Sequence, residues 1–313
     1  MSARRLAVGV AHQTRIALAL LRDEYVRPLP RATGGPLVTV IIAAYNRAEV
    51  LRYALASAMA QSYRNTEILV IGDACTDDSE AVVAAVAAGD ERVEWRNLET
   101  NFGSQVGPNQ AGLESARGEL IAYLGQDDLW RRDHLALLVA DLERTGADVS
   151  STVTSMVWPR PVPTRRLFSP APGGFNPTPA VMHTRAAGLA AGGWVDHRTT
   201  VRPPDLDFNA RLIESGARFS RVRALGVVKF ASALRTGSYR DRDASEQAAT
   251  AARIDRRSFV AREMAVAAAL APLRPWHGRW PEVDRAKAAS PGGTIAEYRR
   301  IRGLDPGDAA RVD

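Results

Sequence analysis

The amino-acid sequence predicts an α/β fold in which a mostly parallel central sheet is flanked by helices. Apolar runs of strand length alternate with segments whose apolar residues recur at helical spacing. The first run, residues 37–44, is apolar along its length. Such a run is typical of a strand that helices cover on both faces, as in a parallel sheet.

The expected elements follow one another through the first half. After the strand at 37–44, Val50, Leu51 and Leu55 recur at helical spacing and predict a helix at 48–61. Further strands are expected at 67–71, 93–98, 119–124 and 148–157, with helices ending near 88 and lying at 105–117 and 135–144. The strand at 119–124 is followed closely by two aspartates.

The second half is less regular. Seven prolines between Trp158 and Pro179 predict an irregular connection, because proline cannot donate a backbone hydrogen bond. Residues 218–230 are expected to close the sheet, and the alanine-rich segment 246–270 is predicted to be one long amphipathic helix. The expected organisation is an N-terminal helical extension (1–36), a domain at 37–240 with halves 37–130 and 131–240, and a C-terminal helix and tail (241–313).

Composition narrows the possible functions. The net charge of +6 comes from 41 basic and 35 acidic side chains, and the only lysines are Lys229 and Lys287. No basic tract interleaved with aromatic residues occurs, so nucleic acid is not an expected partner. The single cysteine, Cys75, fits a reducing compartment. Because no stretch approaches the ~20 apolar residues of a spanning helix, we expect a cytoplasmic protein, with peripheral membrane contact as the alternative.

Polar side chains follow three of the predicted strands: Tyr45 and Asn46, then Asp73, then the adjacent Asp127 and Asp128. Because ligands bind beyond the carboxyl ends of parallel strands, these clusters are expected to form one site. Neighbouring carboxylates repel each other unless a cation lies between them, which favours a divalent metal. The alternative is that one aspartate caps the following helix. No glycine-rich dinucleotide turn or Walker-type loop is present.

Four segments resemble the family-two glycosyltransferases, whose GT-A fold has a Rossmann-like sheet. They are VTVIIAAYNR from residue 38, AMAQSY from 58, EILVIGD from 67 and ARGELIAYL from 116, within a resemblance that extends over about 37–229. The resemblance implies that Tyr45 and Asp73 hold the nucleotide base and that Ala43 and Asn46 belong to the same nucleotide site.

The resemblance also implies a metal site. Asp127 would contact the ribose or the metal, and Asp128 would bind the Mn2+ or Mg2+ ion that bridges the donor diphosphate. Gly72, Gly125 and Pro204 each stand where the family commonly has an acid. The family often has an arginine and a histidine over the diphosphate, and we expect Arg235 or Arg240 to supply that charge here.

By family position, Asp205 is predicted to be the catalytic base. An inverting transfer needs one base to take the proton of the acceptor hydroxyl, while a metal stabilises the leaving diphosphate. Asp207 is the second candidate, although it would lie on a different side of the helix. The alternative role for Asp205 is a helix cap after two prolines. His183 is expected to be a hydrogen-bonded structural histidine, and the alternative is that it approaches the donor diphosphate or the acceptor.

The sequence therefore predicts a metal-dependent inverting glycosyltransferase that uses a nucleotide-diphosphate sugar, with a UDP-sugar as the default donor. The acceptor would be a glycan, a lipid-linked compound, a protein or a small molecule. One alternative is a non-catalytic GT-A domain that binds nucleotide sugars or acts as a scaffold. The other is a nucleotidyltransferase, which usually needs a basic glycine-rich loop that this chain lacks after its first strand.

Overall fold

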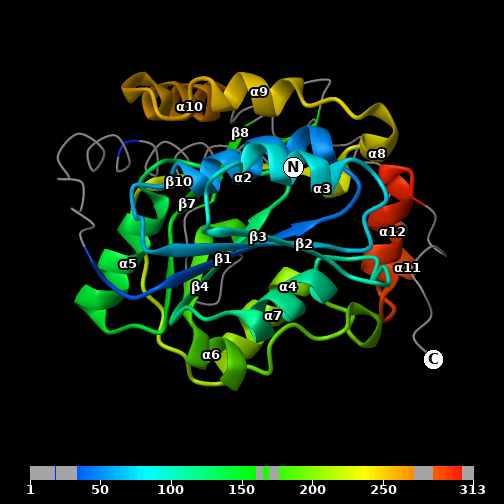
Figure 1. The fold of residues 1–313 in the computed structure, drawn as a ribbon. Helices are drawn as coiled ribbons and strands as arrows, with labels where there is room; N and C mark the ends of the chain where they lie inside the picture. Colours follow the sequence, from blue (N-terminus) through cyan, green and yellow to red (C-terminus); the bar gives the residue numbers. More distant parts are fainter. Residues whose placement is uncertain (1–17, 19–33, 160–164, 169–175, 271–284, 305–313) are drawn as a thin grey trace, which may run out of the picture.

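The computed structural model describes residues 18, 34–159, 165–168, 176–270 and 285–304, and within them the chain forms two β-sheets (Figure 1). The first sheet has the strand order β3-β2-β1-β4-β9-β6. Strands β3, β2, β1 and β4 are parallel, whereas β9 is antiparallel to both its neighbours. The strands are β1 (Val38–Ala44), β2 (Thr66–Gly72), β3 (Val93–Asn97), β4 (Leu120–Gly125), β6 (Val149–Ser151) and β9 (Val181–Thr184).

The register of the first sheet brings the ends of three strands together. Ala44 at the end of β1 pairs with Gly72 at the end of β2, and Ala43 pairs with Gly125 at the end of β4. The loops that follow these strands therefore begin at one edge of the sheet.

The second sheet has the order β5-β10-β7-β8. Its strands are β5 (Leu129–Trp130), β7 (Val153–Val157), β8 (Arg165–Phe168) and β10 (Leu225–Phe230). Strand β10 is antiparallel to β5 and parallel to β7. The chain thus passes from the first sheet to the second between Gly125 and Leu129, across the segment that contains the two adjacent aspartates.

Helices cover both faces of the six-stranded sheet (Figure 1). Helices α2 (Ala48–Met59) and α3 (Ser79–Val86) lie on one face, and α4 (Val106–Ser115), α6 (Arg185–Ala190) and α7 (Pro204–Glu214) lie on the other. Successive residues of β1 face opposite ways, as expected for a strand: Val40 packs in one core cluster with Leu51 of α2, whereas Ile41 packs in another with Leu113 of α4. Helix α5 (His134–Thr145) belongs to the α2 side.

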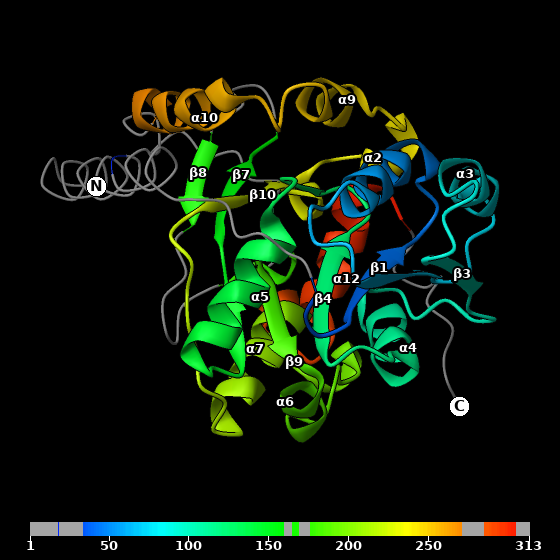
Figure 2. The ribbon, with the colours of Figure 1, turned by 60° about the vertical axis from the view of Figure 1, so that its left-hand side comes forward.

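The C-terminal helices pack against the rest of the molecule in two places. Helices α9 (Ser245–Ala251) and α10 (Arg257–Leu270) lie along the second sheet (Figure 2), where Phe259 and Met264 are buried against Leu225 and Val228. Helix α12 (Gly293–Arg302) follows α11 (Arg285–Ala288) and contacts α8 (Ser238–Asp241) and the 3-10 turn η3 (Ser232–Leu234).

The α/β prediction is confirmed for the first half, where each expected strand and helix is present within two or three residues of its predicted ends. Four predictions for the second half were wrong. The strand at 148–157 is two strands in different sheets, residues 165–168 of the proline-rich connection form β8, and the helix at 246–270 is divided into α9 and α10. Residues 218–230 do not close the first sheet as expected, because β10 begins only at Leu225 and lies inside the second sheet, between β5 and β7.

Most of the N-terminal extension lies outside the described residues. None of the helices in the described part of the chain is long and apolar enough to cross a bilayer.

Candidate active site

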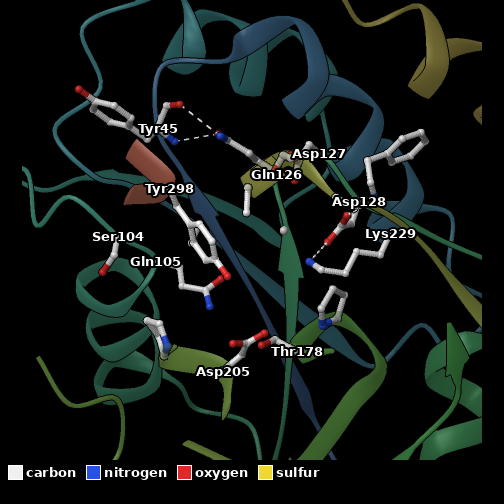
Figure 3. Close-up of a pocket in the computed structure, with 18 of the residues that line it drawn as sticks. Tyr45, Ser104, Gln105, Gln126, Asp127, Asp128, Thr178, Asp205, Lys229 and Tyr298 are labelled. Atoms are coloured by element: carbon white, nitrogen blue, oxygen red, sulfur yellow. Dashed lines mark hydrogen bonds and ion pairs between the residues drawn. The ribbon is translucent and has the colours of Figure 1, made fainter. Parts of the chain in front are cut away.

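A cavity of about 370 Å³ opens at the carboxyl ends of β1, β2 and β4 (Figure 3). Its lining includes the predicted nucleotide-site residues Ala43, Tyr45 and Asp73, the two aspartates Asp127 and Asp128, and the predicted base Asp205. The fold therefore brings together residues from both halves of the predicted domain. Asn46 was predicted for the same nucleotide site but does not line this cavity.

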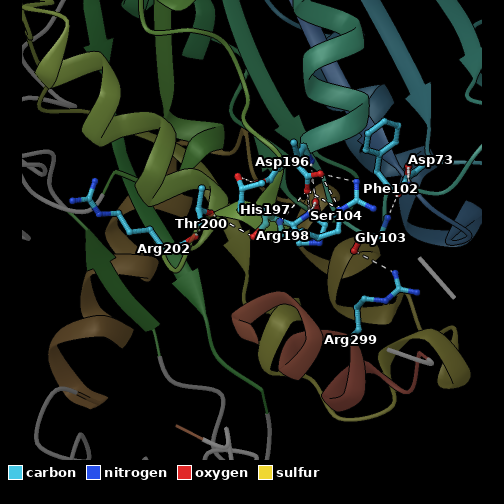
Figure 4. A network of polar contacts seen from close by, with 12 residues as sticks. Asp73, Phe102, Gly103, Ser104, Asp196, His197, Arg198, Thr200, Arg202 and Arg299 are labelled. Atoms are coloured by element: carbon cyan, nitrogen blue, oxygen red, sulfur yellow. Dashed lines mark hydrogen bonds and ion pairs between the residues drawn. The ribbon is translucent and has the colours of Figure 1, made fainter. Parts of the chain in front are cut away.

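Asp73 lies at the end of β2 and organises the neighbouring loop. Its carboxylate accepts hydrogen bonds from the backbone N–H of Phe102, at 2.7 Å, and of Gly103, at 3.0 Å (Figure 4). Burial raises the pKa of this carboxyl to about 6, although the two backbone donors and the charge of Arg299 act in the opposite direction. Asp73 thus combines a place in the cavity wall with a structural role.

Tyr45 is held by Gln126, the residue that follows Gly125 at the end of β4. The backbone N–H of Tyr45 donates to Gln126 Oε1 at 2.7 Å, and Gln126 Nε2 donates to the Tyr45 carbonyl at 3.2 Å. Gln126 Nε2 also donates to the hydroxyl of Tyr239 at 3.1 Å, and the rings of Tyr45 and Tyr239 lie 5.8 Å apart. These bonds fix the end of β1 to the end of β4.

Asn46 has a different local role from the one predicted. Its backbone has φ +40°, and its Oδ1 atom accepts from the N–H groups of Thr76, at 2.7 Å, and Asp77, at 3.3 Å. Asparagine tolerates this left-handed conformation better than most residues. The side chain is therefore turned towards the loop after β2, and a direct contact with a nucleotide in the cavity is not supported.

The structure pairs Asp128 with Lys229 rather than leaving it open to a metal. Asp128 is fully buried, its Oδ2 lies 3.0 Å from Lys229 Nζ, and its Oδ1 accepts from the N–H of Phe230 at 2.9 Å. Burial raises the pKa of Asp128 to about 7, against the effect of Lys229. Burial alone would lower the pKa of Lys229, but Asp128 and Asp127 outweigh it and raise that pKa. Each oxygen of Asp128 thus already has a partner, and a metal ion bound by Asp128 would share the carboxylate with Lys229 and the Phe230 N–H.

Asp127 is the more accessible of the two aspartates. Its Oδ2 is 4.0 Å from Arg47 Nη1, a distance at which the charges attract each other without a close hydrogen bond. Within the described residues, no group of three or more His, Cys, Asp and Glu side chains is arranged to hold a metal ion. The residues present fit a divalent ion that has one protein carboxylate, from Asp127, and takes its other oxygens from a substrate diphosphate and water.

Neither aspartate caps a helix, because α5 begins at His134 and Asp133 is its N-cap residue. The cap alternative for Asp205 is also unsupported. Helix α7 has Pro203 as its N-cap residue, although Asp205 Oδ1 accepts from the N–H of Leu206 at 3.0 Å in the first turn. Asp205 also lines the cavity, where burial raises its pKa and the charge of Lys229 partly opposes that rise.

Asp207 lies two residues further along α7 and is turned away from the cavity lining. Its Oδ2 accepts from Arg211 Nε at 2.8 Å, one helical turn later. His183 is fully buried, with its ring nitrogens near the Thr184 carbonyl, at 2.8 Å, and the Tyr123 hydroxyl, at 3.2 Å. Burial lowers its pKa to about 4, which fits a neutral structural histidine.

A polar network beside the cavity contains a serine, a histidine and an aspartate but does not form a nucleophilic triad (Figure 4). Ser104 Oγ lies 2.9 Å from His197 Nδ1, and Asp196 Oδ1 approaches the same nitrogen at 3.7 Å. In a triad the nucleophile and the acid contact different ring nitrogens. Arg198 pairs with Asp196 as well, and the network fixes the loop that follows β3.

Sequence reasoning missed two contributors to the cavity. Lys229 could have been noticed as one of two lysines in a chain whose basic residues are otherwise arginines. Helix α12 could have been noticed from Ile295, Tyr298, Arg299 and Arg302, which have the spacing of one helix face and all line the cavity. Neither arginine predicted for the diphosphate lines it: Arg235 pairs with Glu246, and Arg240 packs beside Gly303.

Residues 39–169 match the family model described as Glycosyl transferase family 2. The succinoglycan biosynthesis protein ExoO of Rhizobium meliloti (strain 1021) is 37% identical over 115 residues, which are 37% of this chain and 32% of that protein. The putative teichuronic acid biosynthesis glycosyltransferase TuaG of Bacillus subtilis (strain 168) is 35% identical over 100 residues, or 32% of this chain and 39% of that protein. The chain matches well under half the length of these relatives.

Two solved structures have a similar fold. One is S. aureus TarS 1-349 in complex with UDP-GlcNAc, with a TM-score of 0.53, 16% identity, and coverage of 85% of this chain and 90% of that chain. The other is the mannosyltransferase PcManGT from Pyrobaculum calidifontis in complex with GDP-Man and Mn2+, with a TM-score of 0.52, 17% identity, and coverage of 93% and 98%.

Proposed function

We propose that this chain, whose residues 39–169 match the family model described as Glycosyl transferase family 2, transfers a sugar from a nucleotide-diphosphate donor to an acceptor hydroxyl with inversion. The observation that carries the proposal is that Asp205 shares one cavity with Tyr45, Asp73 and Asp127. A donor bound by the last three would have its sugar within the same cavity as a carboxylate whose pKa is raised by burial.

In the proposed reaction, Asp205 takes the proton of the acceptor hydroxyl as that oxygen attacks the anomeric carbon of the sugar. The bond from this carbon to the diphosphate breaks, and the nucleoside diphosphate leaves with the bonding electrons. One base and one leaving group suit a single displacement, so the configuration at the anomeric carbon is inverted. A raised pKa makes Asp205 a stronger base than an exposed aspartate would be.

A divalent ion would be held by Asp127 together with the donor diphosphate. When bound, it would stabilise the negative charge that develops on the leaving diphosphate. Asp128 would support this site by keeping Lys229 in place, since the two side chains are paired at 3.0 Å. Mn2+ and Mg2+ are both candidates, and the complex of PcManGT contains Mn2+.

Two classes of nucleotide sugar, UDP-sugars and GDP-sugars, are the candidate donors. The TarS complex contains UDP-GlcNAc, and the PcManGT complex contains GDP-Man. A UDP-sugar remains our first choice for this chain, and a GDP-sugar is the second. Acceptors with a sugar, lipid, protein or small-molecule hydroxyl are all compatible with the proposed chemistry.

The test compares Asp205→Asn with Asp207→Asn, which is the same chemical change two residues along the same helix. Turnover of a nucleotide sugar that the wild type accepts should fall on the order of 100-fold or more in Asp205→Asn. The affinity for nucleoside diphosphate, measured by calorimetry, should change little. Full activity in Asp205→Asn would rule out its role, and a product with retained configuration would rule out the single displacement.

The main alternative is a non-catalytic GT-A domain that binds a nucleotide sugar, because three acids of the family pattern are replaced. Incubation of the wild-type protein with UDP-GlcNAc and GDP-Man separates the two functions. Slow release of nucleoside diphosphate without acceptor, lost in Asp205→Asn, supports an enzyme. Tight binding with no release, even in the presence of acceptor extracts, supports the binding domain.

A further inference from the structure

Helix α12, near the C-terminus, forms part of the wall of the candidate donor cavity. Ile295, Tyr298, Arg299 and Arg302 line the cavity, together with Leu304 just after the helix. Figure 3 shows Tyr298 projecting from this helix among the side chains of the site. Tyr298 and the proposed base Asp205 line the same cavity, and burial and the charge of Asp205 raise the pKa of the Tyr298 phenol.

The backbone around α12 is fixed to both halves of the molecule. Arg299, which is 3% exposed, donates from Nη1 to the Gly103 carbonyl at 3.2 Å, in the loop that Asp73 organises (Figure 4). Gly292 N–H donates to the Thr200 carbonyl at 3.0 Å, close to α7, and Gly237 N–H donates to the Ile301 carbonyl at 2.9 Å. Hydrogen bonds to other parts of the molecule therefore hold helix α12 in place in the wall of the cavity.

Arg302 differs from the other cations around the cavity. Lys229 is paired with Asp128, and Arg299 is bonded to Gly103. In the described part of the chain, the buried Nε atom of Arg302 has no hydrogen-bond partner. A buried guanidinium N–H without a partner carries a large desolvation cost, which an anionic ligand in the cavity would remove.

The position of Arg302 indicates which anion it would bind. Its charge acts on the phenols of Tyr239 and Tyr298. Tyr239 accepts from Gln126, which holds Tyr45, and Asp127 is near enough to raise the pKa of Tyr239. Arg302 thus lines the same cavity as Tyr45, Asp73 and Asp127, in which the diphosphate of a donor bound by those residues would lie.

We propose that α12 completes the donor site and that Arg302 binds the diphosphate of the nucleotide sugar. This inference rests on the proposed function, and it assigns to the C-terminal helix the positive charge that the sequence analysis sought in Arg235 or Arg240. A guanidinium presents several N–H donors in one plane, which suits two phosphate oxygens at once.

The test measures binding of uridine, UMP and UDP, and of guanosine, GMP and GDP, by calorimetry at constant Mn2+ and salt. Arg302→Gln should lower the affinity for UDP or GDP, whichever the wild type binds, about tenfold or more, because charge-assisted hydrogen bonds to phosphate are lost. Binding of the nucleoside should stay within about twofold. Arg302→Lys should recover part of the affinity.

Arg300→Gln is the matched control, since Arg300 is on the same helix but is exposed and pairs with Glu297 at 2.8 Å. Equal UDP or GDP affinities in Arg302→Gln and Arg300→Gln would overturn the inference while leaving the proposed function intact. Failure of the wild type to bind either nucleoside diphosphate would instead remove the proposed function itself.

Should Arg302→Gln fail to fold, hydrogen exchange on the wild type decides the question. Contact between Arg302 and the diphosphate predicts that UDP or GDP slows amide exchange in residues 293–302 more than the matching nucleoside does. Equal protection by the nucleoside and the diphosphate would count against the inference.

Discussion

At the residue scale, the ion pair between Asp128 and Lys229 is a buried charged contact at the centre of the candidate site. Asp128 is fully buried and Lys229 is its partner at 3.0 Å. A buried carboxylate that loses its only charged partner must either bear the full desolvation cost or take up a proton. The pair should therefore contribute to stability mainly by preventing an uncompensated charge.

We expect Lys229→Met to lower the free energy of unfolding by about 3 kcal/mol at neutral pH. Adding Asp128→Asn to that variant should restore much of the loss, because no charge is then buried. Urea denaturation measures both values, and Lys287→Met, at the other lysine of the chain, is the control. A loss in Lys229→Met no greater than in Lys287→Met would show that the pair does not stabilise the fold.

Single residues also show what the sequence alone could predict about the site. Tyr45, Asp73, Asp127 and Asp205 belong to recognisable motifs, and the structure gathers them in one cavity. Asn46 belongs to the same kind of motif, yet its side chain bonds the loop at Thr76. Motifs identify which residues are near a site, but the direction of a side chain depends on backbone angles, such as the φ of +40° at Asn46, that the motif does not state.

At the scale of elements, Glu67 joins three strands of the first sheet. This buried carboxylate of β2 accepts from Thr39 of β1 and from the N–H groups of Arg117, at 2.7 Å, and Gly118, at 3.2 Å, just before β4. Burial alone would raise its pKa, but the hydrogen bonds from Thr39 and Arg117 and the charge of Arg117 lower it below the ordinary value of 4.5.

A lowered pKa means that the ionised form stabilises the folded state. The contribution is complete above the ordinary pKa near 4.5 and is lost as the pH falls through the lower folded value. Glu67→Gln keeps an acceptor but lacks this charge, so its stability deficit relative to the wild type should shrink between pH 6 and pH 3. Urea denaturation at several pH values tests this, and a deficit independent of pH would contradict it.

Elements differ in how well their sequence patterns specify them. Strands β1, β2 and β4 are buried apolar runs, and each was predicted nearly to its ends. Residues 149–157 also form a continuous β pattern, but the chain changes sheet at Thr152, so that β6 pairs with β9 and β7 pairs with β10. Local sequence predicts a strand and not its partners, since the pairing of distant strands depends on the whole fold.

At the scale of the whole molecule, ligand binding should be visible as a gain in stability, because a ligand that binds only the folded state raises the free energy of unfolding. At a concentration 100 times its Kd, the gain is about 2.7 kcal/mol. If a divalent ion bridges Asp127 and the diphosphate, the thermal shift with UDP or GDP should be larger in Mn2+ than in EDTA.

Two variants distinguish the adjacent aspartates. Asp127→Asn should remove the Mn2+-dependent part of the shift. Asp128→Asn should lower the stability of the protein without ligand, because the wild-type carboxylate is bonded to Lys229 and Phe230. The Mn2+-dependent part of the thermal shift should remain in this variant. The opposite result, with the Mn2+ effect lost only in Asp128→Asn, would restore the metal role that the sequence motif implied for Asp128. Equal shifts in Mn2+ and EDTA would argue against a metal.

The position of α12 has a consequence for recombining this chain with its relatives. A chimaera joined near residue 130 would keep residues 37–130 and exchange the residues that follow, as if the two halves of the predicted domain were independent modules. Helix α12 bonds Gly103 in one half and, through Gly292, Thr200 in the other. A foreign C-terminal segment would therefore have to match both parents, and an exchange that keeps residues 293–302 together with the loops at 103 and 200 has the better chance of preserving the cavity.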